Sequence, residues 1–433
     1  MLSMHAISTL RVKVYATRVP WPGSLSGLRR FFASCVVRHM LHSKSDVRSR
    51  FPLHLLRLGL CVFLPSCTHQ RRILDDHCEL TDEHEITTLV GSDPDDIALL
   101  PNAVAYSEDA GLYMVALEPG SAPRRLGEAC AGGLAQVGDF LACSRPGHDA
   151  KDVRGHVAVY QNERVLFRVE GVGPDGRGVG IAERNGELAL VWNEGRTGAS
   201  ILGIVIRAAD GTLSERTRLS RGGLPAGEPA ILTVDDEFVI VWPETWPNRE
   251  GDLEGALMSQ RLASLDAPLP RARELEELAY DSAHPSLRLG AQGEPVLVFR
   301  DRRPEGTRPH LYLRHLDADS AVREGVHANA AGESFAIPCA DALTVFAPRT
   351  HSRGERIVAV RRHNPTTLEG EGPEHQVYQH GTTFDYADAR CVSVAGSPRG
   401  EARDALLVMA SSASDEHPLG AIRSVRFSCP NPE

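Results

Sequence analysis

Short stretches in which apolar and polar residues alternate recur from about residue 84 to residue 430. In a typical unit, one alternating run ends in a large side chain, a polar turn follows, and a second alternating run comes next. Two copies are clear: one pairs residues 188–192 with 201–206, and the other pairs residues 238–242 with 255–259. Alternation with a period of two is typical of half-buried β-strands. Long runs with helical periodicity are missing from the sequence, so the pattern predicts an all-β fold.

Each unit carries one anchoring side chain at the end of its first run, and the spacing between anchors is 37 to 63 residues. The seven anchors are Tyr106, Cys143, Trp192, Trp242, Phe299, Phe346 and Met409. Most units also contain a short apolar piece before the anchor run and a polar piece after the second run, which gives about four strands per unit. Seven sets of four antiparallel strands predict a β-propeller with about seven four-stranded blades, because each blade buries its sheet faces against its neighbours.

The last unit has sequence for only three strands before the chain reaches Cys429. We expect residues 85–90 at the start of the domain to supply the missing strand and so to close the ring. Cys78 precedes that strand and Cys429 follows its expected neighbour, so we predict a disulfide bond between them.

Six cysteines follow Cys67, and an even number in an exported protein suggests up to three disulfide bonds. Besides Cys78 with Cys429, Cys130 and Cys143 flank one hairpin, and Cys339 and Cys391 occupy matching places in adjacent units. Buried free thiols are the alternative. The spacing C-x-x-C does not occur among them, which disfavours structural zinc and thioredoxin-like chemistry.

Residues 40–67 have the layout of a secretory signal peptide: basic residues, a short apolar run at 58–64, then Pro65, Ser66 and Cys67. The run is too short to span a membrane. Its ending resembles the lipobox of bacterial lipoproteins, which implies lipid attachment at Cys67, and Thr68 after the cysteine favours the outer membrane in that family. A chance cysteine after a plain signal peptide, or a short buried helix, is the alternative.

These features divide the chain into four parts. Residues 1–39 are an over-extended gene start or a disordered basic segment, 40–66 the signal peptide, 67–83 a tether and 84–430 the propeller. The first 67 residues hold ten Lys and Arg and one acid, which leaves 37 basic and 56 acidic residues beyond them, a formal net charge of −19. A domain with this much negative charge is not expected to bind nucleic acid, because nucleic-acid binding depends on positive charge that neutralises phosphates.

Over residues 84–429 the chain resembles the loosely defined propeller repeats of bacterial surface lipoproteins, in pattern and not in a sharp motif. It lacks the Gly-His and Trp-Asp pairs of WD repeats, the double glycine of kelch repeats and the S-x-D-x-G-x-x-W box of sialidase-type propellers. The resemblance implies a propeller that presents one face to a ligand or a protein.

In a propeller, the loop after the second strand of each blade and the loop between blades emerge around the mouth of the central channel. Arginines there suit carboxylate or phosphate groups, and an exposed tryptophan suits a sugar ring. The candidate binding face comprises Glu194, Arg196, Glu244, Trp246, Asp301, Arg302, Arg303, Arg349 and His351. Solvated turns whose acids and arginines pair with one another are the alternative.

Other motifs predict neither a cofactor nor a metal ion. Residues 171–176 match G-x-G-x-x-G, but Pro174 lies inside the match and no helix follows to hold a pyrophosphate, so we interpret it as an inter-blade loop. His375, His380 and Asp385 are interpreted as surface residues, and the acidic segment 92–96 as a turn, since it lacks the glycine and distal glutamate of an EF-hand.

The sequence therefore favours a non-catalytic, lipid-anchored, extracytoplasmic propeller that binds a small molecule, a glycan or a protein. One alternative is a glycan hydrolase or lyase in which a channel-mouth acid such as Glu194, Glu244 or Asp301 transfers the proton. Another is a structural subunit of a cell-envelope complex, which an extended apolar surface patch would indicate.

Overall fold

A computed structural model describes most of the chain beyond residue 78. The described residues are 79–90, 94–147, 155–173, 178–194, 201–220, 226–247, 250, 253–265, 269–278, 283–290, 292–301, 310–318, 321–327, 335–339, 342–350, 356–377, 384–392, 404–411 and 420–428. Within these ranges the chain forms 28 β-strands and no helix, so no described helix is available to cross a membrane. The expected signal peptide, Cys67 and the tether up to residue 78 lie outside them.

The strands form seven four-stranded antiparallel sheets, which we call blades 1 to 7. Blade 1 contains β2 (Pro94–Leu99), β3 (Ala103–Glu108), β4 (Gly111–Ala116) and β5 (Arg124–Gly127). Blade 2 contains β6 (Leu134–Val137), β7 (Phe140–Arg145), β8 (Gly155–Gln161) and β9 (Arg164–Val172). Blade 3 contains β10 (Val179–Arg184), β11 (Glu187–Glu194), β12 (Ile201–Arg207) and β13 (Thr217–Arg218). Blade 4 contains β14 (Ala230–Val234), β15 (Glu237–Pro247), β16 (Leu253–Leu262) and β17 (Arg273–Leu278).

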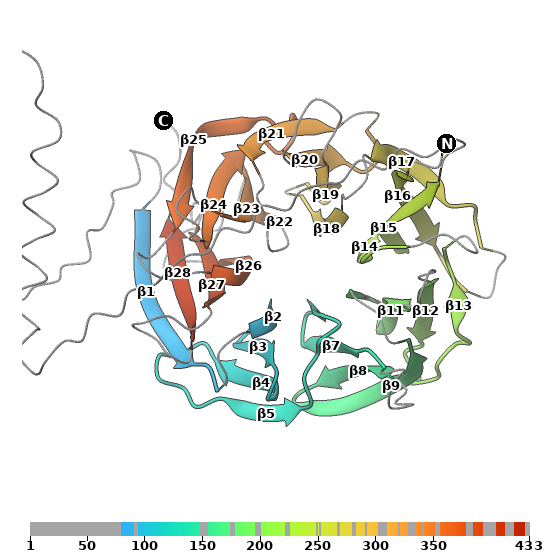
Figure 1. Cartoon of the computed structure of the whole chain (residues 1–433), viewed down its shortest axis with the longest axis horizontal. Helices are drawn as coiled ribbons and strands as arrows, with labels where there is room; N and C mark the ends of the chain where they lie inside the picture. The colour runs from blue at the N-terminus through green and yellow to red at the C-terminus, as the bar shows by residue number, and fades with distance from the viewer. Residues whose placement is uncertain are drawn as a thin grey trace, which may run out of the picture. The chain divides into compact units, whose positions relative to one another are not determined.

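The remaining blades follow the same order along the chain. Blade 5 contains β18 (Ala283–Leu289), β19 (Pro295–Asp301), β20 (His310–His315) and β21 (Val322–His327). Blade 6 contains β22 (Phe335–Cys339), β23 (Ala342–Thr350), β24 (Arg356–His363) and β25 (Gly370–Val377). Blade 7 contains β26 (Phe384–Val392), β27 (Asp404–Ser411), β28 (Ala421–Ser428) and β1 (Glu79–Thr88). The seven sheets stand radially around one axis, with the first strand of each blade innermost (Figure 1).

The predicted seven-bladed propeller is thus confirmed. Every anchor lies on the second strand of its blade and is at most 3% exposed. The N-terminal strand completes the last blade, as expected, by pairing antiparallel with β28. It begins at Glu79, six residues earlier than the predicted start at Glu85, because its pairing with β28 uses backbone groups and does not need alternating side chains.

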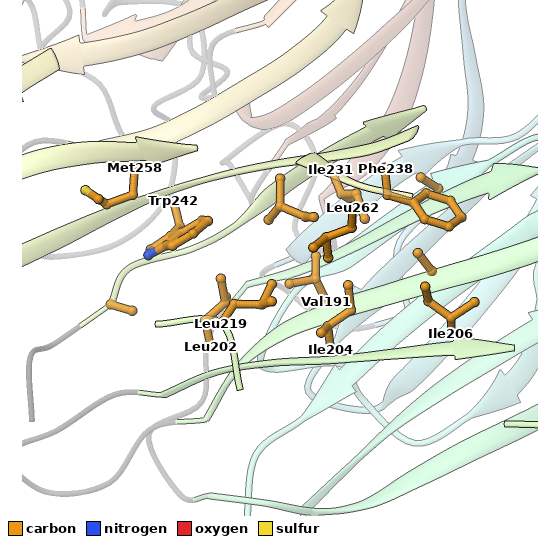
Figure 2. Packing of buried hydrophobic residues seen from close by; sticks show 14 of the residues in the cluster. Val191, Leu202, Ile204, Ile206, Leu219, Ile231, Phe238, Trp242, Met258 and Leu262 are labelled. Carbon is orange, nitrogen blue, oxygen red and sulfur yellow. The ribbon is translucent and has the colours of Figure 1, made fainter. Parts of the chain in front are cut away.

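The hydrophobic core is divided among the seven contacts between adjacent blades, each of which holds one cluster of buried side chains. Figure 2 shows the cluster between blades 3 and 4, in which Trp242 and Phe238 of β15 lie opposite apolar side chains of blade 3 such as Leu202 and Ile206. The cluster between blades 7 and 1 includes Ile86 of β1. A buried aliphatic or aromatic side chain contributes about 1.5–3 kcal/mol, so no blade is stable without its neighbours.

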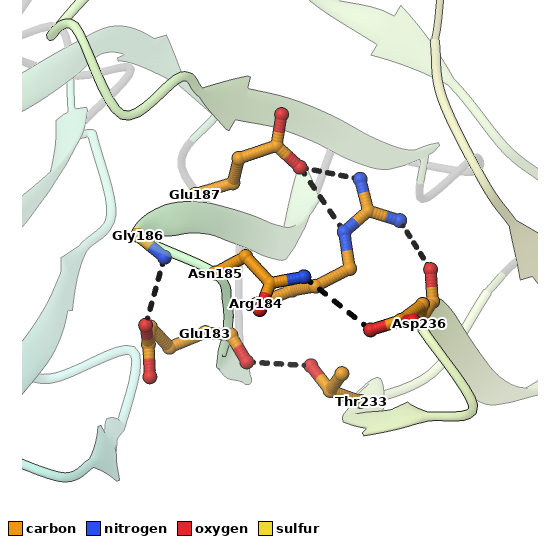
Figure 3. Close-up of polar contacts among 7 residues, drawn as sticks. All are labelled: Glu183, Arg184, Asn185, Gly186, Glu187, Thr233 and Asp236. Atoms are coloured by element: carbon orange, nitrogen blue, oxygen red, sulfur yellow. Dashed lines mark hydrogen bonds and ion pairs between the residues drawn. The ribbon is translucent and has the colours of Figure 1, made fainter.

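Polar contacts between hairpin turns also join adjacent blades. Figure 3 shows the β10–β11 turn of blade 3 beside the β14–β15 turn of blade 4. Arg184 donates to the backbone oxygen of Asp236 at 2.7 Å, and the Thr233 hydroxyl donates to the backbone oxygen of Glu183 at 2.8 Å. The Arg184 guanidinium lies 4.4 Å from the centre of the Phe238 ring. These contacts between the two turns therefore add to the apolar cluster in holding blades 3 and 4 together.

The predicted disulfide bond between Cys130 and Cys143 is present, with the Cα atoms 5.3 Å apart. Cys391 is also disulfide-bonded, and the side chain of Cys339, its predicted partner, lies outside the described residues. Cys78 and Cys429 lie outside them as well, although their neighbours Glu79 and Ser428 are paired across β1 and β28. The bond between Cys78 and Cys429 stays a prediction.

Candidate functional site

A cavity of about 370 Å³ lies on the axis of the propeller, and residues of all seven blades line it. Most of them come from an innermost strand or from the segment just before it, so the cavity lies in the central channel, toward the end where these strands begin. The charged or titratable lining residues are Asp95, Asp96, Glu228, His284, Arg288, Arg300 and Asp388. Phe335, Ile97 and Val179 add apolar surface.

Charge in this cavity is distributed unevenly among the blades. His284 and Arg288 lie on β18 and Arg300 on β19, so the described basic residues of the lining all belong to blade 5. The acids belong to blades 1, 4 and 7. The backbone ladder places Arg300 opposite Ala283, the residue before His284. The cavity therefore has a basic side made by one blade.

His284 and Glu228 form a hydrogen-bonded pair, with 2.6 Å between the ring Nδ1 and the carboxylate Oε2. The Glu228 side chain lies against Gly178, where a Cβ atom would come within 2.6 Å of the Cβ and Cγ of Glu228. Only glycine fits at residue 178 without displacing the glutamate. His284 itself has a φ of +54°, a conformation that residues other than glycine rarely adopt.

Asp388 connects blade 7 to blade 1 and to the basic side of the cavity. It is 7% exposed, and its carboxylate accepts hydrogen bonds of 2.8 Å from the backbone N–H groups of Leu99 and Ala389. A guanidinium nitrogen of Arg288 lies 3.7 Å from Oδ1. Burial raises the pKa of Asp388 above its ordinary value, and the charge of Arg288 and the two backbone donors oppose that rise.

The acids of blade 1 are held by neighbouring elements. Asp96 accepts the backbone N–H of Leu134 in blade 2 at 2.6 Å. The Ser107 hydroxyl donates to Asp95 at 3.3 Å and accepts the backbone N–H of Cys130 at 2.8 Å. The segment fixed by the disulfide bond is therefore linked to the cavity wall. Residues 94–99 form β2, so the prediction of a turn at 92–96 is wrong for the part of it that the structure describes.

The three acids proposed for proton transfer do not line the cavity. Glu194 and Asp301 end the second strands of blades 3 and 5, and Glu244 lies three residues before the end of the second strand of blade 4. At most 6% of each acid is exposed. Glu194 and Glu244 each accept the indole N–H of the anchoring tryptophan two residues earlier, at 3.0 Å. Residues two apart on a strand share a face, so these acids point into the interfaces between blades.

The other residues of the predicted binding face are not brought together in the described part of the chain. Trp246 is half-buried, packs against the cluster between blades 3 and 4, and donates from Nε1 to Glu254 at 3.3 Å. Arg349 lies on β23, and its side chain is outside the described residues. Arg196, Arg302, Arg303 and His351 lie outside them entirely.

The loops proposed from the sequence lie at the same end of the propeller as this cavity, but none of the described residues of the predicted binding face lines it. Residues 227–232 and 284–289 served in the prediction only as turn signals that open inner strands, although they contain Glu228, His284 and Arg288. The side chains of His375 and Asp385, and all of His380, lie outside the described residues. Among the described residues, no group of three His, Cys, Asp or Glu side chains has the arrangement of a metal site.

No known protein family matches the chain, and neither does any curated protein sequence. Solved structures do resemble it. One is a polysaccharide lyase, an ulvan lyase bound to the saccharide -[GlcA(1-4)Rha3S]-, which is 9% identical to this chain with a TM-score of 0.52. The match covers 80% of this chain and 95% of the lyase. A subtype N10 neuraminidase-like protein of a little yellow-shouldered bat strain is 10% identical, with a TM-score of 0.43 and coverage of 82% and 100%.

A protein of unknown function from Dyadobacter fermentans is 9% identical, with a TM-score of 0.46 and the same coverage of 82% and 100%. At such low identity these similarities show the fold alone. The chain is a seven-bladed propeller with neuraminidase-like and polysaccharide lyase proteins among its structural neighbours.

Proposed function

We propose that this propeller binds an acidic saccharide, one that contains a uronate, in the mouth of its central channel. The observation that carries the proposal is that the described basic residues of the cavity, among them Arg288 and Arg300, all come from blade 5, whereas Asp95 and Asp96 line it from blade 1. Guanidinium groups pair with carboxylates, and carboxylates accept hydrogen bonds from sugar hydroxyls. The cavity volume is within the usual range for ligand sites.

Among the described residues, four acids line the cavity, and two of them already bind the backbone of neighbouring strands. Asp96 and Asp388 each accept two backbone N–H bonds, and Asp388 lies near Arg288. The basic side formed by Arg288 and Arg300 is therefore the part of the cavity suited to an anion. The saccharide bound in the ulvan lyase contains glucuronate, which supports this choice of ligand.

Binding can be tested by calorimetry with the full chain and glucuronate oligosaccharides. The control ligand is the same oligosaccharide with its carboxyl groups reduced to alcohols. Arg288→Ala and Arg300→Ala should each weaken binding about ten- to a hundredfold, because a hydrogen bond to a charged group contributes about 1.5–3 kcal/mol. The matched control is Arg124→Ala, since Arg124 forms a surface pair with Glu163 and does not line the cavity.

Three results distinguish the outcomes. Preference for the carboxylated ligand, lost in both cavity variants and kept in Arg124→Ala, supports the proposal. Equal affinity for the carboxylated and reduced ligands removes the role given to the arginines. Failure of every uronate oligosaccharide to bind the wild-type protein overturns the proposed function.

The alternative of a structural envelope subunit gains no support from the surface. In the described part of the chain, the large hydrophobic residues that are exposed are Val90, Val165, Leu213 and Leu289, and they belong to or adjoin four different blades. Isolated exposed apolar residues are normal on soluble proteins. They do not form an extended docking patch.

We further propose that the propeller is exported and carried on a bacterial membrane by lipid attached to Cys67, and the outer membrane is the expected location. The signal-like segment at 40–67 supports this proposal. Metabolic labelling with a radioactive fatty acid should mark the wild-type protein and not Cys67→Ser. Equal labelling of both proteins, or of neither, overturns the proposal.

A further inference from the structure

The Glu228–His284 pair and the two arginines line one cavity. We propose that the pair makes this cavity a catalytic site that cleaves the acidic saccharide by β-elimination. The inference rests on the proposed binding of a uronate and adds a reaction to it. His284 is the base, Glu228 is the residue that positions it, and Arg288 and Arg300 stabilise the charge that develops on the carboxylate. The role of Glu228 follows from its contact with His284, and the roles of the arginines follow from the cavity lining that they share with the pair.

Glu228 determines which ring nitrogen of His284 is available to a ligand. A carboxylate that accepts a hydrogen bond from Nδ1–H leaves the lone pair of a neutral imidazole on Nε2. No described residue forms a hydrogen bond with Nε2, and 41% of the His284 side chain is exposed where it lines the cavity. His284 can therefore take a proton from a bound saccharide.

The pair is held in place from two sides. Gly178 leaves room for the Glu228 side chain to lie against the start of β10, and the His284 backbone keeps its unusual φ of +54° at the start of β18. Backbone strain of this kind persists only where the surrounding structure fixes it, and it is frequent at functional sites. The pair joins blades 4 and 5, 56 residues apart in the sequence.

Arg288 and Arg300 come from the same blade as this base and line the same cavity. Arg288 is four residues beyond His284 on β18, and Arg300 faces Ala283 across the ladder. A uronate carboxylate on these guanidinium groups has its negative charge neutralised, which makes the proton on the adjacent carbon easier to remove. Fixed positive charge also stabilises the enolate-like transition state.

The reaction balances without a cofactor. His284 Nε2 removes the proton from C5 of the uronate, and the electron pair of that C–H bond forms a C4–C5 double bond. The C4–O bond breaks, and its electrons leave with the oxygen. The imidazolium then returns the proton to that oxygen, so the products are an unsaturated uronate and a new hydroxyl end. No water is consumed, and nothing is oxidised or reduced overall.

The experiment follows the ultraviolet absorbance of the unsaturated uronate when the full chain is incubated with glucuronate oligosaccharides. We expect His284→Ala to lower kcat by about 10²- to 10⁴-fold, the usual contribution of a general base, while calorimetric affinity for the oligosaccharide stays within about threefold. His284→Gln is a second variant in case His284→Ala folds poorly. The matched control is His315→Ala, because His315 is on the outer part of blade 5 and contacts Thr366.

Glu228→Gln tests the positioning role separately. It should lower kcat about tenfold or more and leave KM within about twofold, because the base is misplaced and the arginines are intact. A purely structural role for Glu228 would lower stability without this division between kcat and KM.

Several outcomes overturn the proposal. If the wild-type protein binds the uronate but forms no unsaturated product, the elimination is wrong and the binding function stands. Saturated products identify hydrolysis instead, and unchanged kcat in His284→Ala removes the assigned base. If the wild-type protein neither binds nor cleaves the saccharide, the proposed function fails as well.

Discussion

The indole Nε1–H of Trp242 donates a hydrogen bond to Oε1 of Glu244 at 3.0 Å, and both residues are completely buried. Trp192 and Glu194 form the same contact, also at 3.0 Å, in the preceding blade. A buried indole N–H without an acceptor is costly, and the acid two residues later supplies that acceptor on the same face of the strand. These acids are therefore part of the contact between blades and not of a solvent-facing site.

Replacement of Glu244 should affect stability and not ligand binding. Glu244→Ala leaves the Trp242 N–H without this acceptor, and we expect a loss of about 1–3 kcal/mol in the free energy of unfolding. Glu244→Gln keeps an acceptor oxygen and should lose clearly less. Urea unfolding monitored by tryptophan fluorescence measures both. A stable Glu244→Ala protein, or one that folds normally but no longer binds the saccharide, contradicts the structural role.

Gly178 and Gly120 provide a matched pair of glycine substitutions. Their φ angles are similar, +77° and +73°, but a Cβ at Gly178 would meet Glu228 at 2.6 Å, whereas a Cβ at Gly120 would have no atom within 4 Å. Gly120→Ala should therefore lose only the backbone contribution, about 1 kcal/mol. Gly178→Ala should lose a further 1–3 kcal/mol, roughly, from the steric clash.

The same pair separates stability from function. Because the clash displaces Glu228, Gly178→Ala should also lower any catalytic turnover more than Gly120→Ala does. Thermal unfolding and the ultraviolet assay measure the two effects. Indistinguishable melting temperatures for the two variants would show that the Glu228 side chain moves away from the added Cβ without a loss of stability.

The architecture could be predicted because its determinants are local and repeated. Each anchor, such as Trp192 or Phe299, follows an alternating run, and the repetition of that pattern implies a ring whatever the surface residues are. The start of β1 was harder to place, because residues 79–84 are mostly polar. Their pairing with β28 depends on backbone hydrogen bonds, and these do not require an alternating pattern of apolar and polar residues.

The site could be predicted only in its general location. The predicted loops lie at the same end of the propeller as the cavity, but Glu194 and Glu244 follow buried tryptophans and accept hydrogen bonds from their indole N–H groups. The cavity instead depends on contacts between blades, such as Glu228 with His284 across 56 residues. A single sequence cannot show which turn side chains point toward the axis, because their direction is set by the packing of neighbouring blades.

Asp388 should make stability depend on pH in a way that can be isolated. Its pKa is raised in the folded state, chiefly by burial, from an ordinary value of 3.8, so the folded protein binds the proton more tightly than the unfolded chain does. Its stabilising contribution is therefore fully present below about pH 3.8 and is lost as pH rises through the folded pKa.

Asp388→Asn removes this titration, so the difference in unfolding free energy between wild-type and variant proteins should change in favour of the variant as pH rises through that window. Urea unfolding at several pH values measures it, and the other carboxyl groups cancel in the difference. A difference that is constant with pH, or that changes in favour of the wild-type protein, contradicts the raised pKa.

The disulfide bond between Cys130 and Cys143 should stabilise both the fold and the cavity. It joins two cysteines that are 13 positions apart in the sequence, and for a loop of that length the entropy lost by the unfolded chain corresponds to about 3 kcal/mol. The backbone N–H of Cys130 also donates to Ser107, whose hydroxyl donates to Asp95 in the cavity wall. Replacing both cysteines with alanine should therefore lower the unfolding free energy by roughly 3 kcal/mol and weaken saccharide binding severalfold.

Ser107→Ala is the matched variant, because it breaks the link to Asp95 and leaves the disulfide bond intact. It should weaken binding about as much as the double cysteine variant while losing less stability. Calorimetry and urea unfolding on the three proteins separate the two effects. If Ser107→Ala binds as the wild-type protein does and the cysteine variant does not, the disulfide bond shapes the cavity through the backbone of residues 131–134 and not through the hydroxyl of Ser107.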